Sequence, residues 1–168
     1  GLPVSLAGSA LAGLAGRRKG NEVKMKIAVK KLRENAIMPT FGSPGAAGAD
    51  LYACLASPVT VAPGETAFIP TGLAMELPVG YVGLVYARSG LACKRGLAPA
   101  NKVGVIDSDY RGEFIVALHN HGTESQTVAS GERIAQLVVT PILMPEYVET
   151  DSLSATQRGE GGFGSTGK

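Results

Sequence analysis

The chain has 168 residues, of which 45% are hydrophobic and 18% are charged, so it can bury a core and is not a disordered polar chain. Its net charge of +2 is unevenly divided: residues 1–34 carry eight basic and two acidic residues, whereas residues 35–168 carry eight basic and twelve acidic residues. The body of the protein is therefore mildly acidic, and its composition gives no reason to expect a nucleic-acid polymer as partner.

Residues 1–24 differ in composition from the rest of the chain. A stretch rich in Gly, Ala, Leu and Ser runs to Gly16 and is followed by Arg17-Arg18-Lys19. A secretory signal places its positive charge before the apolar run, and here the order is reversed. We predict a flexible leader or linker with an unknown partner over residues 1–24, and a domain that begins near Met25.

From Met25 onward, Gly or Pro interrupts short apolar segments at intervals of about 8–12 residues, which is typical of all-β proteins. The predicted strands are Ile27–Leu32, Ala49–Leu55, Thr66–Ile69, Leu73–Leu77, Tyr81–Tyr86, Val103–Ile106, Glu113–Asn120, Gln126–Ala129 and Ile134–Pro141. One short helix is predicted over Ser89–Lys94, ended by Gly96. The pattern predicts a sandwich, jelly roll or barrel over residues 25–149, followed by a mobile Gly/Ser/Thr-rich arm over residues 150–168.

An acidic turn follows two apolar residues, Val105 and Ile106. Asp107-Ser108-Asp109 comes next and a strand resumes at Glu113, which is typical of a β-hairpin. We expect this apolar pair to be buried, so that Asp107 can be held rigidly at the edge of a cavity, where it can act as a general base. Acids in turns also serve as solvated caps, so the turn alone leaves both interpretations open.

Two further segments suggest anion binding. Arg88-Ser89 lies where a strand gives way to a helix, so free backbone N–H groups can face an anion; an N-capping Ser beside a surface Arg explains the pattern equally well. The arm holds Arg158, five glycines within nine residues, Phe163, and Ser165-Thr166. Such an arm can close over a phosphorylated ring compound, or it can be a disordered terminus.

Five segments that follow one another along the chain carry a family resemblance. They are residues 47–53 (AGADLYA), 88–92 (RSGLA), 101–112 (NKVGVIDSDYRG), 131–138 (GERIAQLV) and 158–167 (RGEGGFGSTG). Together they resemble the ordered motifs of the trimeric dUTP pyrophosphatases (dUTPases). The resemblance implies a jelly-roll-like (β-clip) subunit and a homotrimer whose active sites are shared between subunits. It also implies Mg²⁺-dependent hydrolysis of dUTP to dUMP and pyrophosphate.

The resemblance also implies roles for individual residues. Asp107 matches the general base, which takes a proton from the water that attacks the α-phosphorus. Tyr110 matches the ring that packs under the deoxyribose and excludes a 2′-hydroxyl, and Phe163 matches a ring that stacks on uracil. The uracil itself is expected to be read by the side chain of Asn101 and by Gly104, Val105 and Ile106.

The remaining matched positions concern the phosphates and the metal. Asp50 matches an acid that holds Mg²⁺ through its water shell rather than directly. The implied phosphate-binding residues are Arg88, Ser89, Gly90, Gln136, Arg158, Gly164, Ser165 and Thr166.

Two alternatives to a dUTPase remain at this point. One is a dCTP deaminase-like member of the same superfamily, which the arm and the Asp107–Tyr110 segment disfavour. The other is a non-catalytic trimeric scaffold or binding module in which residues 1–24 are the working part. No apolar run reaches the ~20 residues that cross a bilayer, and Cys54 and Cys93 form no CxxC motif. We therefore expect no membrane partner and a cytoplasmic location.

Overall fold

Residues 25–164, the part of the chain that the computed structural model describes, form eleven strands and one helix. The predictions for the leader and for Ser165 and Thr166 lie outside these residues. The all-β prediction is confirmed. In chain order the elements are β1 (Ala28–Lys31), β2 (Thr40–Phe41), β3 (Ala49–Tyr52), β4 (Val59–Val61), β5 (Thr66–Glu76), β6 (Tyr81–Tyr86), α1 (Ser89–Arg95), β7 (Leu97–Pro99), β8 (Gly104–Ile106), β9 (Glu113–Asn120), β10 (Gln126–Val128) and β11 (Arg133–Pro141).

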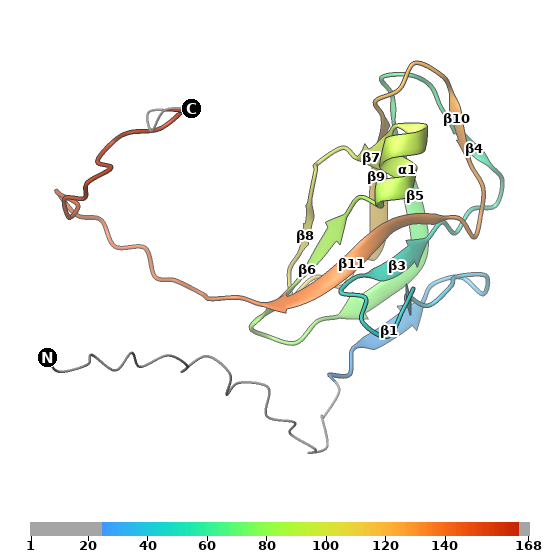
Figure 1. Ribbon diagram of the computed structural model, residues 1–168. Coiled ribbons are helices and arrows are strands. Elements are labelled where there is room, and N and C mark those ends of the chain that lie inside the picture. Colours follow the sequence, from blue (N-terminus) through green and yellow to red (C-terminus); the bar gives the residue numbers. More distant parts are fainter. Residues whose placement is uncertain (1–24, 165–168) are drawn as a thin grey trace, which may run out of the picture.

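The strands form two main sheets that pack around one apolar core (Figure 1). A four-stranded sheet has the order β1-β5-β9-β7, and a five-stranded sheet has the order β2-β3-β11-β6-β8. Strands β4 and β10 pair separately. The core draws on both sheets: Leu73 and Phe114 come from the first, and Leu51 and Ile134 come from the second.

The side-chain alternation of β9 shows why the sheets pack this way. Phe114, Val116 and Leu118 are buried, while Ile115 between them is 51% exposed. Asn120 continues the buried face at 0% exposure, and its amide donates to the carbonyls of Val61 and Glu124. A period of two thus presents one face of the strand to the core and leaves the other face open.

Strand β5 corrects the sequence analysis, which predicted two strands, Thr66–Ile69 and Leu73–Leu77. The structure has one strand with a register shift against β9 between Pro70 and Ala74. Side chains satisfy the backbone at the irregularity: the Thr71 hydroxyl donates to the Phe114 carbonyl (2.6 Å), and the Gly72 amide donates to Glu113 Oε1 (2.8 Å). Gly72 takes a φ of 69°, which favours glycine.

The helix α1 lies close to its predicted position. Leu91 packs into the core, and Gly96 ends the helix with a φ of 65° while its amide bonds to the carbonyls of Leu91 and Ala92. The first turn contains no acidic residue, and the last turn carries Lys94 and Arg95. This distribution suits the helix dipole at the C-terminal end and leaves the N-terminal end free to meet an anion.

Large apolar side chains remain exposed at several places on the chain. Phe68, Val105 and Ile115 are 73%, 63% and 51% exposed near the open face of the four-stranded sheet. After Pro141 the described chain forms no further strand, and Figure 1 shows it running away from the sheets. Its exposed apolar residues are Leu143, Met144, Tyr147, Val148 and Leu153. Exposed apolar surface of this extent is a common feature of interaction sites.

Within residues 25–164, no helix is long and apolar enough to cross a membrane.

Candidate active site

A polar pocket of about 280 Å³ lies where α1 begins beside the five-stranded sheet. The residues that line it are Gly42, Ala46, Gly48, Asp50, Arg88, Ser89, Gly90, Arg133 and Gln136. The five phosphate and metal residues predicted from the body of the chain, Asp50, Arg88, Ser89, Gly90 and Gln136, all lie in this pocket.

Asp50 is the carboxylate at the centre of the pocket and is only 9% exposed. Arg88 Nε donates to its Oδ1 at 2.8 Å, and Arg133 Nη1 lies 3.6 Å from its Oδ2. Two guanidinium groups thus share one carboxylate, which leaves the pocket with an excess of positive charge. Such an arrangement orients the arginines and favours a polyanion over a free cation.

The backbone and Gln136 complete this anion-binding surface. Ser89 and Gly90 lie in the first turn of α1, where amide groups have no partner within the helix. Gln136 Nε2 donates to the Ala87 carbonyl at 2.9 Å, which fixes the side-chain amide. A Cβ on Gly48 would lie 2.6 Å from Gln136 Oε1, so only glycine allows this approach.

The pocket does not offer a direct coordination shell for a divalent metal. Within residues 25–164, no group of three or more His, Cys, Asp and Glu side chains is arranged to hold a metal ion. Asp50 is the pocket's carboxylate, and both of its oxygens face arginines. The donors fit a hydrated Mg²⁺ that is carried by phosphates, since Mg²⁺ commonly keeps several waters and is held by few carboxylates.

A second, more apolar pocket of about 300 Å³ contains the residues predicted to bind the base. Asn101, Gly104, Val105 and Ile106 line it together with residues from the four-stranded sheet, among them Ile115. Strand β8 is the outermost strand of its sheet, so one side of its backbone has no neighbouring strand among the described residues. An edge of this kind offers donors and acceptors at fixed positions.

The segment that carries Asp107 is not the β-hairpin predicted from the sequence. Strand β8 pairs with β6 in one sheet, whereas β9 pairs with β5 and β7 in the other, so the turn between them crosses from sheet to sheet. The predicted burial of Val105 is also wrong, because this side chain is 63% exposed. The local sequence is typical of a hairpin, but each flanking strand pairs with strands from other parts of the chain. Asp107 lies exposed directly after β8.

Tyr110 is held in place by its own turn. Its hydroxyl donates to the Glu113 carbonyl at 2.9 Å, and its ring centroid lies 6.3 Å from that of Phe114. A Cβ on Gly112 would lie 2.6 Å from the Tyr110 Cζ, so glycine is needed for the ring to lie where it does. The ring remains 42% exposed and can still contact a ligand.

The described part of the arm, residues 150–164, lines neither pocket of its own chain. Arg158 Nε donates to the Gly161 carbonyl within the arm (2.8 Å), and the side chain of Phe163 is fully exposed. Gly164 is the last described residue. The two pockets share no lining residue. The predicted site residues therefore form three separate groups in one chain, in the polar pocket, at β8 and its following turn, and on the arm.

Three residues that structure this site were not predicted to have a role. Arg133 lies three positions before Gln136, and strict alternation would place the two on opposite faces of a strand. The register shift between Arg133 and Ala135 brings both to one pocket. Gly48 and Gly112 act through close approaches that only the folded chain reveals. All three lie inside the quoted motifs, which is the one sequence signal that could have drawn attention to them.

Comparison with known proteins identifies the family of the chain. The sequence model of the dUTPase family matches residues 34–167. The deoxyuridine 5'-triphosphate nucleotidohydrolase of Desulfitobacterium hafniense (strain DSM 10664 / DCB-2) is 53% identical over 148 residues, which cover 88% of this chain and 98% of that protein.

Solved structures share the fold as well. The Staphylococcus bacteriophage 80alpha dUTPase with dUpNHpp has a TM-score of 0.78 and 33% identity, covering 85% of this chain and 99% of that one. A mutant dUTPase from phage phi11 of S. aureus, described with a structural Mg(II) ion, has a TM-score of 0.71 and 28% identity, covering 78% and 100%. These likenesses place the chain among all-β proteins with the dUTPase fold. The chain belongs to the dUTPase family.

Proposed function

We propose that this chain hydrolyses dUTP to dUMP and pyrophosphate, which limits uracil incorporation into DNA and supplies dUMP for dTTP synthesis. The observation that carries the proposal is the polar pocket, in which Arg88 and Arg133 engage one carboxylate beside the first turn of α1. In a chain of the dUTPase family, a pocket of this charge suits the triphosphate of dUTP.

Asp107 is the proposed general base. Its carboxylate orients a water molecule and takes one of its protons as the water oxygen bonds to the α-phosphorus. The bond from the α-phosphorus to the bridging oxygen breaks, and pyrophosphate leaves with that oxygen. Asp107 then returns its proton to solvent. Its exposed position directly after the edge strand β8 supports this role, because a ligand on that strand lies close to it.

The base and sugar are proposed to bind at β8 and the turn that follows. The free edge of Gly104–Ile106 and the amide of Asn101 can hydrogen-bond to a pyrimidine, as a pairing base does. The Tyr110 ring then contacts the deoxyribose and leaves no room for a 2′-hydroxyl. Phe163 closes the other side of the base when the arm folds over, and Arg158, Gly164, Ser165 and Thr166 contact the phosphates.

Mg²⁺ is proposed to enter with the substrate. When bound to the phosphates it would neutralise part of their charge, and Asp50 would hold it through water rather than directly. Arg88, Ser89, Gly90 and Gln136 bind the phosphate oxygens and fix the chain of phosphates for attack. The arginines on Asp50 support an indirect contact, since both carboxylate oxygens are already engaged.

A homotrimer with shared active sites accounts for the separation of the three residue groups. Among the described residues, the polar pocket and the β8 pocket share no lining residue, and residues 150–164 of the arm line neither pocket and run away from the body (Figure 1). The apolar side chains that follow Pro141 and those near the open sheet face would be covered in such an assembly. A solution mass of three chains, measured by light scattering, tests the assembly directly.

Pyrophosphate release tests the activity. We expect release from dUTP, much slower release from UTP, dTTP and dCTP, and a strong decrease when Mg²⁺ is chelated. Ammonia release from dCTP would instead identify the deaminase-like alternative. A trimeric protein that releases neither product would contradict the proposed activity and direct attention to residues 1–24. A cytoplasmic location stays a prediction from the sequence.

A further inference from the structure

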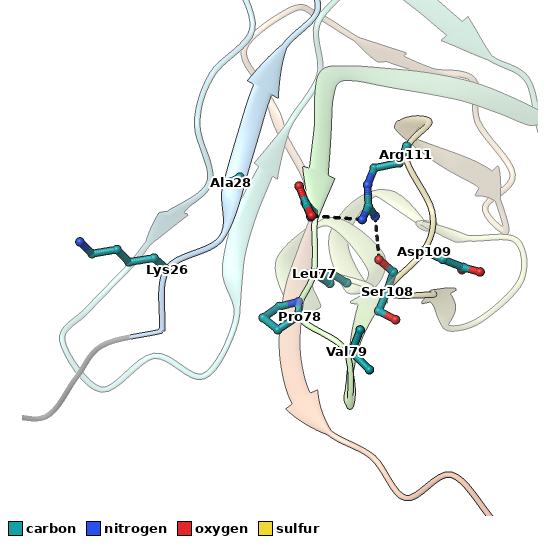
Figure 2. Close-up of a pocket in the computed structure, with 9 residues that line it drawn as sticks. Lys26, Ala28, Leu77, Pro78, Val79, Ser108, Asp109 and Arg111 are labelled. Atoms are coloured by element: carbon teal, nitrogen blue, oxygen red, sulfur yellow. Dashed lines mark hydrogen bonds and ion pairs between the residues drawn. The ribbon is translucent and has the colours of Figure 1, made fainter.

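Arg111 follows the Asp107–Tyr110 turn directly, and its guanidinium folds back onto that turn. Nη1 donates to the carbonyls of Ser108 (2.7 Å) and Tyr110 (3.0 Å), while Nη2 lies 3.3 Å from Glu76 Oε1. Figure 2 shows Arg111 near Ser108 and Asp109, with a dashed line along its hydrogen bond to Ser108. One side chain thus ties the turn to a strand outside it.

The turn depends on such a contact because it lacks the support of a hairpin. Its flanking strands, β8 and β9, belong to different sheets and do not pair with each other. The backbone hydrogen bond that closes the turn runs from the Tyr110 amide to the Asp107 carbonyl and is 3.2 Å long. The conformation of the Asp107 and Tyr110 backbone therefore depends strongly on side chains.

Glu76 supplies a fixed point for this contact. It is the last residue of β5, and β5 pairs with β1 on one side and β9 on the other, with Glu76 opposite Ala28. Both side chains border a pocket of about 370 Å³ on the outer side of the turn, with Lys26, Ala28 and Val79 among its other residues (Figure 2). The polar pocket and the β8 pocket include neither Arg111 nor Glu76.

We propose that Arg111, anchored by Glu76, is a positioning residue that holds the Asp107–Tyr110 turn in the geometry needed for dUTP hydrolysis. It acts through the Ser108 and Tyr110 carbonyls and contacts no substrate. The proposal rests on the proposed function, because it assigns Arg111 a role through Asp107 and Tyr110.

The ion pair of Arg111 with Glu76 and its hydrogen bonds to the two carbonyls have different requirements. Arg111 and Glu76 side chains are 54% and 62% exposed, so their ion pair contributes little to global stability and is screened by salt. The two carbonyl hydrogen bonds need the planar guanidinium, which can reach both oxygens from one nitrogen while its neighbour faces Glu76. A lysine at position 111 can keep the ion pair with Glu76, but it cannot make this ion pair and both carbonyl hydrogen bonds in the same geometry.

The first test measures order in the turn without reference to activity. In the assembled full-length protein, Arg111→Met is expected to speed amide hydrogen exchange over residues 108–112, and Arg111→Lys is expected to have a smaller effect. Lys31→Met is the matched control. It removes an exposed cation from the four-stranded sheet that also holds Glu76, but at the end of β1 far from Glu76. Unchanged exchange in Arg111→Met would overturn the proposal.

The second test separates positioning from binding and from folding. For Arg111→Met we expect kcat to fall roughly tenfold to a hundredfold, as small misplacements of catalytic groups do, with KM for dUTP within about twofold. Thermal stability and oligomeric state should match those of Lys31→Met. Glu76→Gln should show a weaker fall in kcat that disappears in about 1 M salt, where the wild-type ion pair is itself screened.

The outcomes distinguish this proposal from the proposed function. A wild-type protein that does not hydrolyse dUTP contradicts the function, while the exchange experiment still reports on the turn. A wild-type level of kcat in Arg111→Met contradicts the positioning role, as does a loss of kcat matched by a loss of assembly.

Discussion

Asp107 and Asp109 lie in the same exposed turn, but only Asp107 directly follows the edge strand β8. Asp109 borders the outer pocket beside Arg111 instead. We expect Asp107→Asn to lower kcat for dUTP by about 10²–10⁴-fold, the usual contribution of a general base, while equilibrium binding of dUTP stays near normal. Asp109→Asn removes a similar charge from the same turn and should leave kcat almost unchanged. Near-normal turnover in Asp107→Asn, or an equal loss in both variants, would contradict the assignment.

Gly112 sets the position of the Tyr110 ring, because a Cβ there would lie 2.6 Å from the ring's Cζ. Gly112→Ala should displace the ring and weaken the rejection of a 2′-hydroxyl. We expect the ratio of kcat/KM for dUTP over UTP to fall by roughly tenfold, since this ratio measures discrimination between the two sugars. Gly45→Ala is the control, as a Cβ at Gly45 meets nothing within 4 Å. An unchanged ratio in Gly112→Ala would mean that Tyr110 does not read the sugar.

At the scale of single residues, the sequence can predict those candidate site residues whose chemical role is tied to their residue type and their place in a motif. Asp50, Arg88, Ser89, Gly90 and Gln136 were named from motifs, and the structure brings them to one pocket. The supporting residues could not be found in this way. Arg133 reaches the pocket through a register shift, and Arg111 acts across the chain on a turn and on Glu76. Such roles depend on contacts between segments that are distant in the sequence.

At the scale of elements, regular alternation was predictable and its interruptions were not. Strand β9 and helix α1 agree closely with the sequence pattern, because burial and capping are local signals. Strand β5 was divided at Pro70 and Gly72, although Thr71 and Glu113 side chains sustain it through the irregularity. Strands β2, β4 and β7 have only two or three residues each, too few for a period of two to be detected.

The chain after β11 has two parts that truncation can separate. The first part, which precedes the arm, carries the exposed apolar residues Leu143, Met144, Tyr147 and Val148, and the arm carries Arg158 and Phe163. A chain that ends after Asp151 should therefore still assemble, because the apolar part remains. It should lose about 10²-fold or more in kcat/KM for dUTP, because closure over the substrate is lost.

Light scattering and pyrophosphate release measure the two effects of this truncation separately. Loss of assembly on truncation would show that the last part of the arm is structural. Full activity in the truncated chain would show that the arm does not take part in the reaction.

At the scale of the whole molecule, the candidate site residues of one chain lie in separate groups. The polar pocket and the β8 pocket have no lining residue in common, and the described arm contacts neither. In the proposed function, each group contacts a different part of the nucleoside triphosphate. An assembly that brings the groups of different chains together would complete the site and cover the exposed apolar side chains in one step. Assembly would then be a condition of activity rather than only of stability.

Subunit mixing tests this division. Asp107→Asn chains and chains truncated after Asp151 are each expected to be almost inactive alone. If Asp107 and the arm of one site come from different subunits, randomly mixed trimers should regain about one quarter of wild-type activity, since each part is intact in half of the chains and is drawn independently. The same chains combined without subunit exchange serve as the control. Mixed trimers that form, as seen by native mass spectrometry, yet stay inactive would show that Asp107 and the arm of each site belong to one chain.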